Sequence, residues 1–306
     1  MTGGAGFIGS HTVDRLLAEG LEVVVFDDLR RGQMENISQH VGERNFRFVR
    51  GDVRDSSLVR DSVRDVDSVV HLAALISVPE SIKDPNLTND VNVNGTLNLL
   101  KACVDFGVER FVYASSCAVY GNVESLPIKE ECPARPESPY GVSKLVAENY
   151  VRTYHEDFGL ETVCLRYFNV YGPRQVYSDY SGVITQFLSR LARNLPLVIF
   201  GGGEQTRDFV YVHDIVEANV LALKCEGVRL AGEIFNVGTG VATSISQLAN
   251  ALLEVTNKTR LKIMHSEARE GDIRHSVADT SKARDKLGYK PIVLLKDGLG
   301  KLLRRV

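Results

Sequence analysis

Short runs rich in β-branched and aromatic residues alternate with longer amphipathic segments along the first half of the chain. The runs lie at Glu22–Phe26, Phe46–Val49, Ser68–His71, Arg110–Ala114 and Thr162–Arg166. Alternation of this kind is typical of an α/β fold in which helices cover both faces of a parallel sheet. Because the runs are almost wholly apolar, we predict a doubly wound parallel sheet whose strands are buried on both sides.

The pattern changes after residue 168. A loop with the sequence YGPRQ is followed by an amphipathic segment near 183–194, a turn with the sequence GGGEQ and the segment RDFVYVHD. One more strand-like run, at 233–238, is expected to rejoin the main sheet. We therefore predict a nucleotide-binding domain over 1–168, joined by about 211–238. A smaller, interleaved domain over 169–210 and 239–306 is predicted to hold the substrate.

Composition excludes several classes of function. The net charge of the 306 residues is -3 and the basic residues are scattered, which disfavours nucleic acid or an anionic membrane as a partner. The five cysteines are odd in number and contain no C-x-x-C pair, so we expect reduced thiols in a cytoplasmic enzyme, with no metal site. The longest apolar stretch, 68–78, is shorter than the roughly 20 residues that span a bilayer.

The opening MTGGAGFIGSH contains glycines at positions 3, 6 and 9. In a Rossmann-type fold Gly3 permits the tight turn and Gly6 lets backbone amides approach a pyrophosphate. Gly9 lets the following helix lie close to the sheet. Asp27 ends a strand 18 residues after Gly9, near the position that binds an adenosine ribose.

A carboxylate at Asp27 would repel a 2′-phosphate, so we predict NAD as the cofactor. Arg30 and Arg31 follow directly and leave NADP open. The simpler alternative is a glycine-rich turn before an ordinary helix, with an acidic turn at 27–28. Finding both features together makes that alternative the weaker one.

The segment SPYGVSKLVAENY places Tyr140 and Lys144 four residues apart on a predicted helix, so both side chains share one face. A tyrosine has an ordinary pKa of about 10, and a nearby ammonium together with an oxidised nicotinamide would favour the phenolate. Tyr140 is therefore a candidate catalytic base. A surface tyrosine and lysine at helical spacing is the common alternative.

The segment FVYASSCAVYG predicts a strand that delivers two serines at its carboxyl end, where open α/β sheets bind their ligands. Ser116 could bond a substrate oxygen or the Tyr140 hydroxyl. Alternatively, the serines could belong to a turn that satisfies its own backbone. Two arginines from separate loops, Arg207 and Arg269, suit a diphosphate because each guanidinium can bind it with two hydrogen bonds. Surface salt bridges are the alternative for either one.

Eight segments together resemble the extended short-chain dehydrogenase/reductase family, and more narrowly its nucleotide-sugar enzymes of the UDP-glucose 4-epimerase kind. In chain order they are TGGAGFIGSH, HLAA, NVNGT, ASSCAVYG, SPYGVSK, LRYFNVYGPRQ, GGGEQTRDFVYVHD and REGDIRHSVADTSKA. The resemblance covers essentially the whole chain.

The resemblance implies three sets of site residues. The NAD site would comprise Gly3, Gly6, Phe7, Ile8, Gly9, Asp27, Asp28, Asp52, Val53, Ala73, Ala74, Ser115, Tyr140, Lys144 and Phe168. The catalytic group would be Tyr140, Lys144 and Ser116. The UDP-sugar site would comprise Ser116, Tyr140, Asn169, Arg207, Arg269, Asp272 and Ser276.

The implied reaction is C4 epimerisation of a UDP-hexose through a 4-keto intermediate. Related dehydratases carry an acidic pair where this chain has Cys117-Ala118, so 4,6-dehydration is disfavoured. The family's gate for a 2-N-acetyl group corresponds to Ser276, whose small size leaves room for UDP-GalNAc beside UDP-galactose. A UDP-glucuronate 4-epimerase and a net nucleotide-sugar oxidoreductase stay open, and a non-catalytic NAD-binding regulator is the weakest alternative.

Two further expectations come from the resemblance. Segments 92–107 and 141–157 are expected to form helices that pair across a two-fold axis, giving a homodimer, or else simply to cover the sheet. Family members carry a hydrophobic strand ending in Val-Thr before the first glycine, where this chain has Met-Thr. We therefore expect the true reading frame to begin upstream of Met1.

Overall fold

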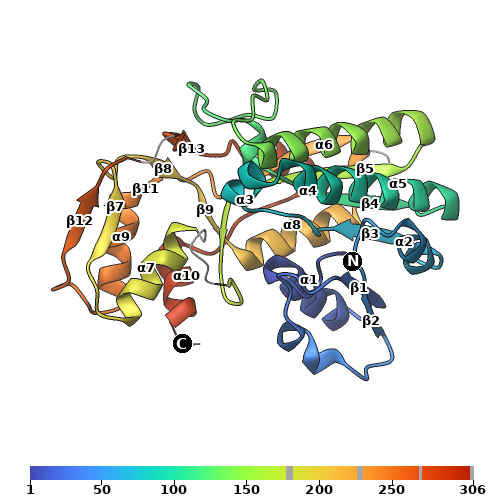
Figure 1. Ribbon diagram of the computed structural model, residues 1–306, viewed down its shortest axis with the longest axis horizontal. Helices are drawn as coiled ribbons and strands as arrows, with labels where there is room; N and C mark the ends of the chain where they lie inside the picture. The colour runs from blue at the N-terminus through green and yellow to red at the C-terminus, as the bar shows by residue number, and fades with distance from the viewer. Residues whose placement is uncertain (177–181, 226–229, 269–270, 304–306) are drawn as a thin grey trace.

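The computed structural model describes residues 1–176, 182–225, 230–268 and 271–303. Parallel strands and their covering helices form a larger lobe, and β7, β12, α7 and α9 lie to the left of it in Figure 1. Among the described helices, none is both long and apolar enough to cross a membrane.

The larger lobe is built on two runs of parallel strands joined at their centre. The first run pairs β1 (Val23–Asp27) with β2 (Phe46–Arg50), and the second has the order β10-β5-β4-β3. Thr2 bridges both runs in parallel, to Phe26 and to His71. The order across the sheet therefore matches the 3-2-1-4-5-6 pattern of a Rossmann fold. The strands of the second run are β3 (Ser68–His71), β4 (Arg110–Ser116), β5 (Glu161–Tyr167) and β10 (Glu233–Val237).

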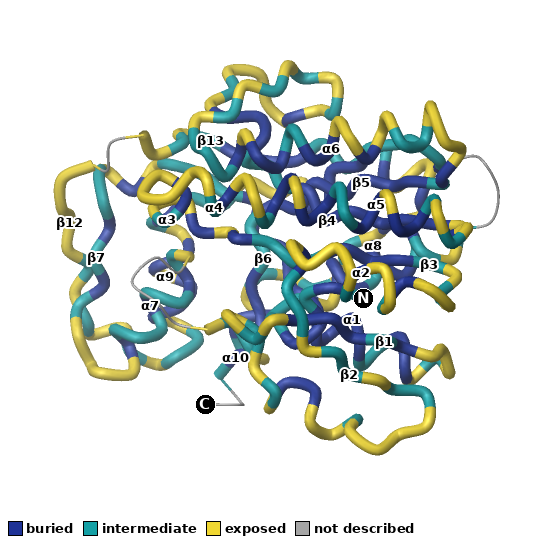
Figure 2. Tube along the Cα trace, turned by 45° about the vertical axis from the view of Figure 1, so that its right-hand side comes forward, coloured by how far each residue is buried: buried dark blue, intermediate teal, exposed yellow. Residues whose placement is uncertain are grey.

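The predicted strands are confirmed to within two residues at each end, and the strand-like run at 233–238 does rejoin the sheet, beside β5. Helices cover both faces, as predicted. One face carries α2 (Ser56–Val63), α5 (Gly95–Phe106) and α6 (Pro139–Phe158), and the other carries α1 (Phe7–Ala18) and α8 (Val212–Lys224). Figure 2 shows the strands β4 and β5 buried between these layers.

The chain start lies in the middle of the sheet. The Met1 carbonyl accepts a hydrogen bond from the Phe26 N–H (2.8 Å), and the Thr2 N–H donates to the Val70 carbonyl (3.0 Å). The Met1 amine donates to the Val24 carbonyl at 2.6 Å, and burial lowers its pKa to about 5. The glycine-rich turn that follows is thus held between β1 and β3.

The smaller lobe has its own apolar cluster. It is formed by α7 (Val183–Ala192), α9 (Ile245–Val255), α10 (Leu295–Leu303) and the strand pair β7 (Leu197–Phe200) and β12 (Ile263–Ser266). The boundaries that we assign to the two domains stay a prediction.

Short strands connect the two lobes. Strand β6 (Asn169–Tyr171) pairs with β9 (Phe209–Tyr211), and β8 (Thr206–Arg207) lies between β11 (Thr243–Ser244) and β13 (His275–Ser276). The remaining helical segments are η1 (Met34–Asn36), η2 (Ser38–His40), α3 (Val78–Lys83), α4 (Pro85–Asn89), η3 (Asp90–Asn94), η4 (Cys117–Val119) and η6 (Ala283–Leu287).

Candidate active site

The sequence-predicted residues gather at one edge of the sheet. Because all its strands are parallel, their carboxyl ends meet at the same edge, where a doubly wound sheet binds ligands. Asp27 ends β1, Ser115 and Ser116 end β4, and Phe168 follows β5. Ala73 and Ala74 follow β3, and Asp52 and Val53 follow β2, at this same edge.

The glycine turn fits a bound pyrophosphate. Gly3 has a φ of +68°, and a Cβ added there would lie 2.8 Å from the Ala73 nitrogen. A Cβ on Gly9 would lie 2.0 Å from the Gly3 carbonyl oxygen, so the turn and α1 can approach this closely only with glycine at both positions. Helix α1 begins at Gly6 with no side-chain cap in the described part of the chain, which leaves its amino end free for an anion.

Asp27 fits the adenosine ribose of NAD. Its two carboxylate oxygens accept hydrogen bonds from the Ala5 N–H (3.0 Å) and the Leu29 N–H (2.9 Å), which fix its orientation at the strand end. Burial raises the pKa of this carboxyl. A carboxylate held so has lone pairs left for ribose hydroxyls.

Neighbouring charged residues are already engaged. The Arg31 guanidinium contacts both carboxylate oxygens of Glu80 on α3 at 2.8 Å, so it is committed to an ion pair. Asp52 accepts three hydrogen bonds from the Arg54 guanidinium, which lowers its pKa. Asp28 is exposed, and its side chain accepts a hydrogen bond from the Arg30 N–H at 2.9 Å.

Two predicted cofactor residues also contribute to packing. The side chains of Phe7 and Ile8 contact the apolar cluster of the smaller lobe, and Ile8 also contacts the cluster between the sheet and α8. Their position in the first turn of α1 still places their backbone amides at the helix amino end.

The predicted catalytic group comes together. Helix α6 starts at Ser138, whose hydroxyl accepts a hydrogen bond from the Gly141 N–H at 3.1 Å. Tyr140 is the second residue of this helix, and its phenol lies beside the Ser116 side chain at the end of β4. The Lys144 ammonium donates to the Ala114 carbonyl at 2.7 Å, and its burial lowers its pKa to about 7.

The electrostatics of Tyr140 differ from our expectation in one respect. Burial raises the pKa of its phenol to about 12, and the opposing influence is the neighbouring Ser116 side chain rather than the Lys144 ammonium. The ammonium instead lies 4.8 Å from the centre of the Tyr113 ring. The protein alone thus keeps the phenol protonated at neutral pH, so a positive charge from outside the chain is needed to favour the phenolate.

The predicted substrate residues lie next to the predicted catalytic group. The Cys117 thiol lies beside Ser276 of β13, and Ser276 is the strand partner of Arg207 in β8. The Arg207 guanidinium donates to Asp272 at 2.7 Å. The buried side-chain oxygen of Asn169 has no hydrogen-bond partner among the described residues, as expected where a ligand is to bind. Arg269 lies outside the described residues.

Sequence reasoning missed Asp208 as a member of this region. It is fully buried and accepts hydrogen bonds from the Thr239 N–H (2.7 Å), the Gly240 N–H (2.8 Å) and the Ala278 N–H (3.2 Å). These bonds join the strand that carries Arg207 to the segment that follows Ser276. The sequence signal for Asp208 was its position directly after an arginine at the end of a strand. That position alone does not distinguish a buried aspartate that holds the backbone from an exposed one.

A family model described as GDP-mannose 4,6 dehydratase matches residues 1–302. A UDP-glucose 4-epimerase of Mycolicibacterium smegmatis is 40% identical over 303 residues, which cover 98% of this chain and 96% of the relative. The chain belongs to the epimerase/dehydratase family of extended short-chain dehydrogenases/reductases.

Solved members of this epimerase/dehydratase family share the fold over nearly the whole chain. A UDP-glucose 4-epimerase from Thermotoga maritima, solved with UDP-glucose, superposes with a TM-score of 0.92 at 39% identity, covering 99% of this chain and 96% of the other. The Thermus thermophilus UDP-glucose 4-epimerase, solved with NAD, gives a TM-score of 0.89 at 39% identity and the same coverage. Within the family the chain is a nucleotide-sugar epimerase, as the resemblance implied.

Proposed function

We propose that the enzyme interconverts UDP-galactose and UDP-glucose by NAD-dependent epimerisation at C4. The observation that carries the proposal is the Tyr140 phenol, which lies beside Ser116 at the sheet edge where the glycine turn and Asp27 also lie. Relatives solved with NAD and with UDP-glucose support both ligands. We assign the cofactor, catalytic and substrate roles to the residues that the sequence predicts.

Tyr140 accepts the proton of the sugar 4-hydroxyl while Ser116 holds the same oxygen. NAD, when bound, supplies the acceptor for the C4 hydride and a positive ring that favours the phenolate. Once the 4-ketone has turned over, Tyr140 would return the proton to the same oxygen, so that the hydroxyl forms again with the opposite configuration at C4. Because the reaction has no net redox change, it consumes no cofactor.

The binding energy lies on the nucleotide side in this proposal. Arg207, oriented by its ion pair with Asp272, holds the diphosphate, and Asn169 offers its unpartnered amide oxygen nearby. A sugar held loosely beyond that anchor can rotate without dissociating. We propose that Ser276 leaves room for a 2-N-acetyl group, so UDP-GalNAc is also a substrate.

The residues beside Ser116 argue against dehydration. Burial raises the pKa of the Cys117 thiol to about 11, so the thiol stays neutral. Ala118 carries no ionisable group. Neither side chain can protonate a leaving hydroxyl or remove a C5 proton at neutral pH.

The test is to incubate the purified protein, without added cofactor, with UDP-galactose, UDP-GalNAc and UDP-galacturonate separately. We expect UDP-glucose from the first and UDP-GlcNAc from the second. Tyr140→Phe should lower turnover by about a thousandfold, within the range for loss of an acid–base group, while retaining bound NAD. Turnover of UDP-galacturonate alone would indicate a uronate epimerase, a requirement for added NAD a net oxidoreductase, and bound NAD without turnover a regulator.

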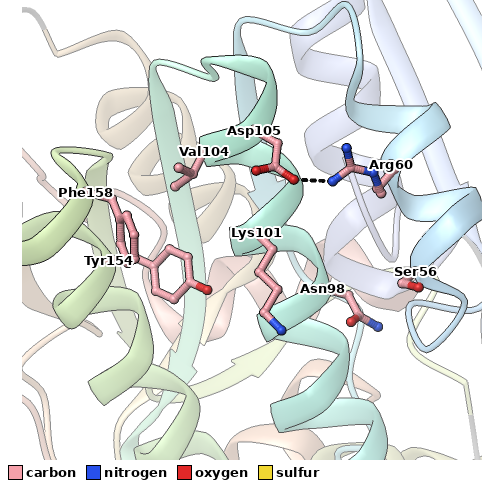
Figure 3. A pocket seen from close by; sticks show the side chains of 8 residues that line it. All are labelled: Ser56, Arg60, Asn98, Lys101, Val104, Asp105, Tyr154 and Phe158. Carbon is pink, nitrogen blue, oxygen red and sulfur yellow. Dashed lines mark hydrogen bonds and ion pairs between the residues drawn. The ribbon is translucent and has the colours of Figure 1, made fainter.

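We further propose that α5 and α6 form a homodimer interface. Both helices lie on one face of the sheet, and α6 exposes Val142, Tyr150 and Phe158, the last with 57% of its surface accessible. Figure 3 shows Tyr154 and Phe158 of α6 on one side of a groove and Lys101 and Asp105 of α5 on the other. Sedimentation equilibrium should give twice the chain mass, and Phe158→Glu should shift it toward the monomer.

A further inference from the structure

A buried ion pair lies directly behind the catalytic group. Glu148 follows Tyr140 and Lys144 on α6 at two successive four-residue steps, so the three side chains share one helix face. Its carboxylate accepts hydrogen bonds from the Arg166 Nε (3.0 Å) and the Ser115 hydroxyl (2.7 Å). Arg166 of β5 is the register partner of Ser115 in β4. The accessible fractions of Glu148 and Arg166 are 1% and 4%.

The pair extends into a network that reaches the next strand. The Arg166 Nη1 donates to the Tyr120 hydroxyl at 2.7 Å and to the Glu130 carbonyl at 3.1 Å. The Tyr120 hydroxyl in turn donates to the Asn236 side-chain oxygen in β10 at 2.7 Å. Hydrogen bonds therefore join α6 to the carboxyl ends of β4, β5 and β10. Helix α6 carries Tyr140 and Lys144, β4 ends at Ser116, and β5 is followed closely by Asn169.

Stability alone does not account for the pair. Burying two charges costs several kcal/mol per ion, and well-packed apolar residues in the same space are often as stable or more so. What such a pair offers over apolar side chains is direction, because the guanidinium fork and the carboxylate fix one another's orientation. The direction is useful here because Ser115 precedes Ser116, which lies beside the Tyr140 phenol.

We propose that Glu148 and Arg166 are positioning residues for the reaction, holding the end of β4 against α6 so that Ser116 and Tyr140 meet at the sugar. The inference rests on the proposed function for its kinetic readout. In this role neither residue touches the substrate.

The pair also keeps the field near Tyr140 neutral. Tyr113 of β4 and Cys164 of β5 lie near Glu148, and both stay neutral because burial raises their pKa values. Arg152 is a further charged residue on α6, the helix that carries Glu148. Around Tyr140 itself lie Ser116, Cys117 and Lys144. Two helix turns separate Glu148 from Tyr140, about 12 Å along the axis. At an effective dielectric constant of about 20, one uncompensated charge at that distance shifts an ionisation by up to about 1 pH unit.

Removing the negative or the positive charge of the pair should therefore shift the pKa of Tyr140 in opposite directions. Glu148→Gln keeps the shape and leaves the Arg166 cation unpaired, so the phenolate forms at lower pH. Arg166→Met leaves the Glu148 anion unpaired, so the phenolate forms at higher pH. The double variant Glu148→Met with Arg166→Met removes both charges and should restore the pH profile without restoring the geometry.

The experiment measures kcat, KM and the acidic limb of the kcat–pH profile for UDP-galactose with the holoenzyme of each variant. We expect kcat to fall at least 10-fold in all three, since small misplacements of reacting groups carry costs of about this size or larger, with KM within threefold. The acidic limb should move to lower pH by about 0.5 to 1 unit in Glu148→Gln and to higher pH in Arg166→Met.

The matched control is Glu161→Gln, which breaks the ion pair of Arg110 and Glu161 at the opposite end of the same two strands. It should leave kcat and the pH limb unchanged. Equal losses in Glu161→Gln and Glu148→Gln would overturn the inference, as would shifts of the same sign in the two single-charge variants.

A second readout does not depend on turnover. Ultraviolet titration of the holoenzyme, taken as the difference from Tyr140→Phe protein, reports ionisation of that phenol and should show the same opposite shifts. A wild-type protein that turns over no UDP-sugar would refute the proposed function alone. Unchanged kcat together with unshifted titrations in both single variants would refute the positioning role alone.

Discussion

His71, at the end of β3, should make the folded protein sensitive to mild acid. The Thr96 hydroxyl donates to the Asn92 carbonyl (2.6 Å) and so accepts from the His71 Nε2–H (2.9 Å). The Thr2 hydroxyl accepts the Ala73 N–H (3.2 Å) and so donates to the His71 Nδ1 (2.6 Å). This chain of bonds is complete only with a neutral ring, because a proton on Nδ1 would face the Thr2 donor.

The pKa of His71 falls to about 3 because burial disfavours the charged ring, and the nearby Lys144 ammonium adds to the effect. A folded-state pKa below the unfolded value of 6.5 means that the unfolded chain binds more protons between pH 3 and 6.5. Stability is therefore lost as the pH falls through that window. Between pH 7 and pH 5 the linkage relation gives a loss of about 2 kcal/mol from this group.

The assay is urea unfolding followed by circular dichroism at pH 7 and pH 5, on wild type, His71→Gln and the control His265→Gln, which changes an exposed residue. We expect His71→Gln to be less stable at pH 7 because it disturbs both threonine contacts. Its loss between pH 7 and pH 5 should nevertheless be about 2 kcal/mol smaller than that of wild type. Equal losses in wild type and His71→Gln would refute the assigned neutral ring.

Three other substitutions test the site. Asp208→Asn replaces one of two accepting oxygens with an NH₂ that faces two N–H donors, so we expect unfolding free energy to fall by about 3 kcal/mol and KM for UDP-galactose to rise, measured by urea unfolding and kinetics. An unchanged KM would contradict the anchoring of Arg207. Gly9→Ala puts a Cβ 2.0 Å from the Gly3 oxygen; we expect purified protein to have lost most of its NAD, while Gly182→Ala, with open space around its Cβ, retains it. Glu80→Gln releases Arg31 from an exposed pair, so NAD dissociation, followed by fluorescence, should speed up by less than about fivefold and only at low salt. A larger effect would mean that the pair does more than tie the segment after β1 to α3.

The order of elements and the chemistry of the site were accessible from local pattern. Apolar runs of four to six residues predict strands, and β1 to β5 and β10 lie where this pattern places them. The prediction that every strand is buried on both sides is wrong for β2, which pairs only with β1 and has no buried residue. Tyr140 and Lys144 share a face because helical spacing requires it. Asp27 lies at a strand end because its run of apolar residues stops there.

The tertiary structure alone decided the partners of these residues. No spacing in the sequence pairs Glu148 with Arg166, or brings Asp208 to the backbone of residues 239, 240 and 278, because these contacts join segments that meet only when the sheet is assembled. The pKa of Tyr140 was likewise outside the reach of sequence, since burial outweighs any effect of the ammonium four residues away. Local pattern identifies which groups can react, and long-range packing sets the charge and direction with which they do so.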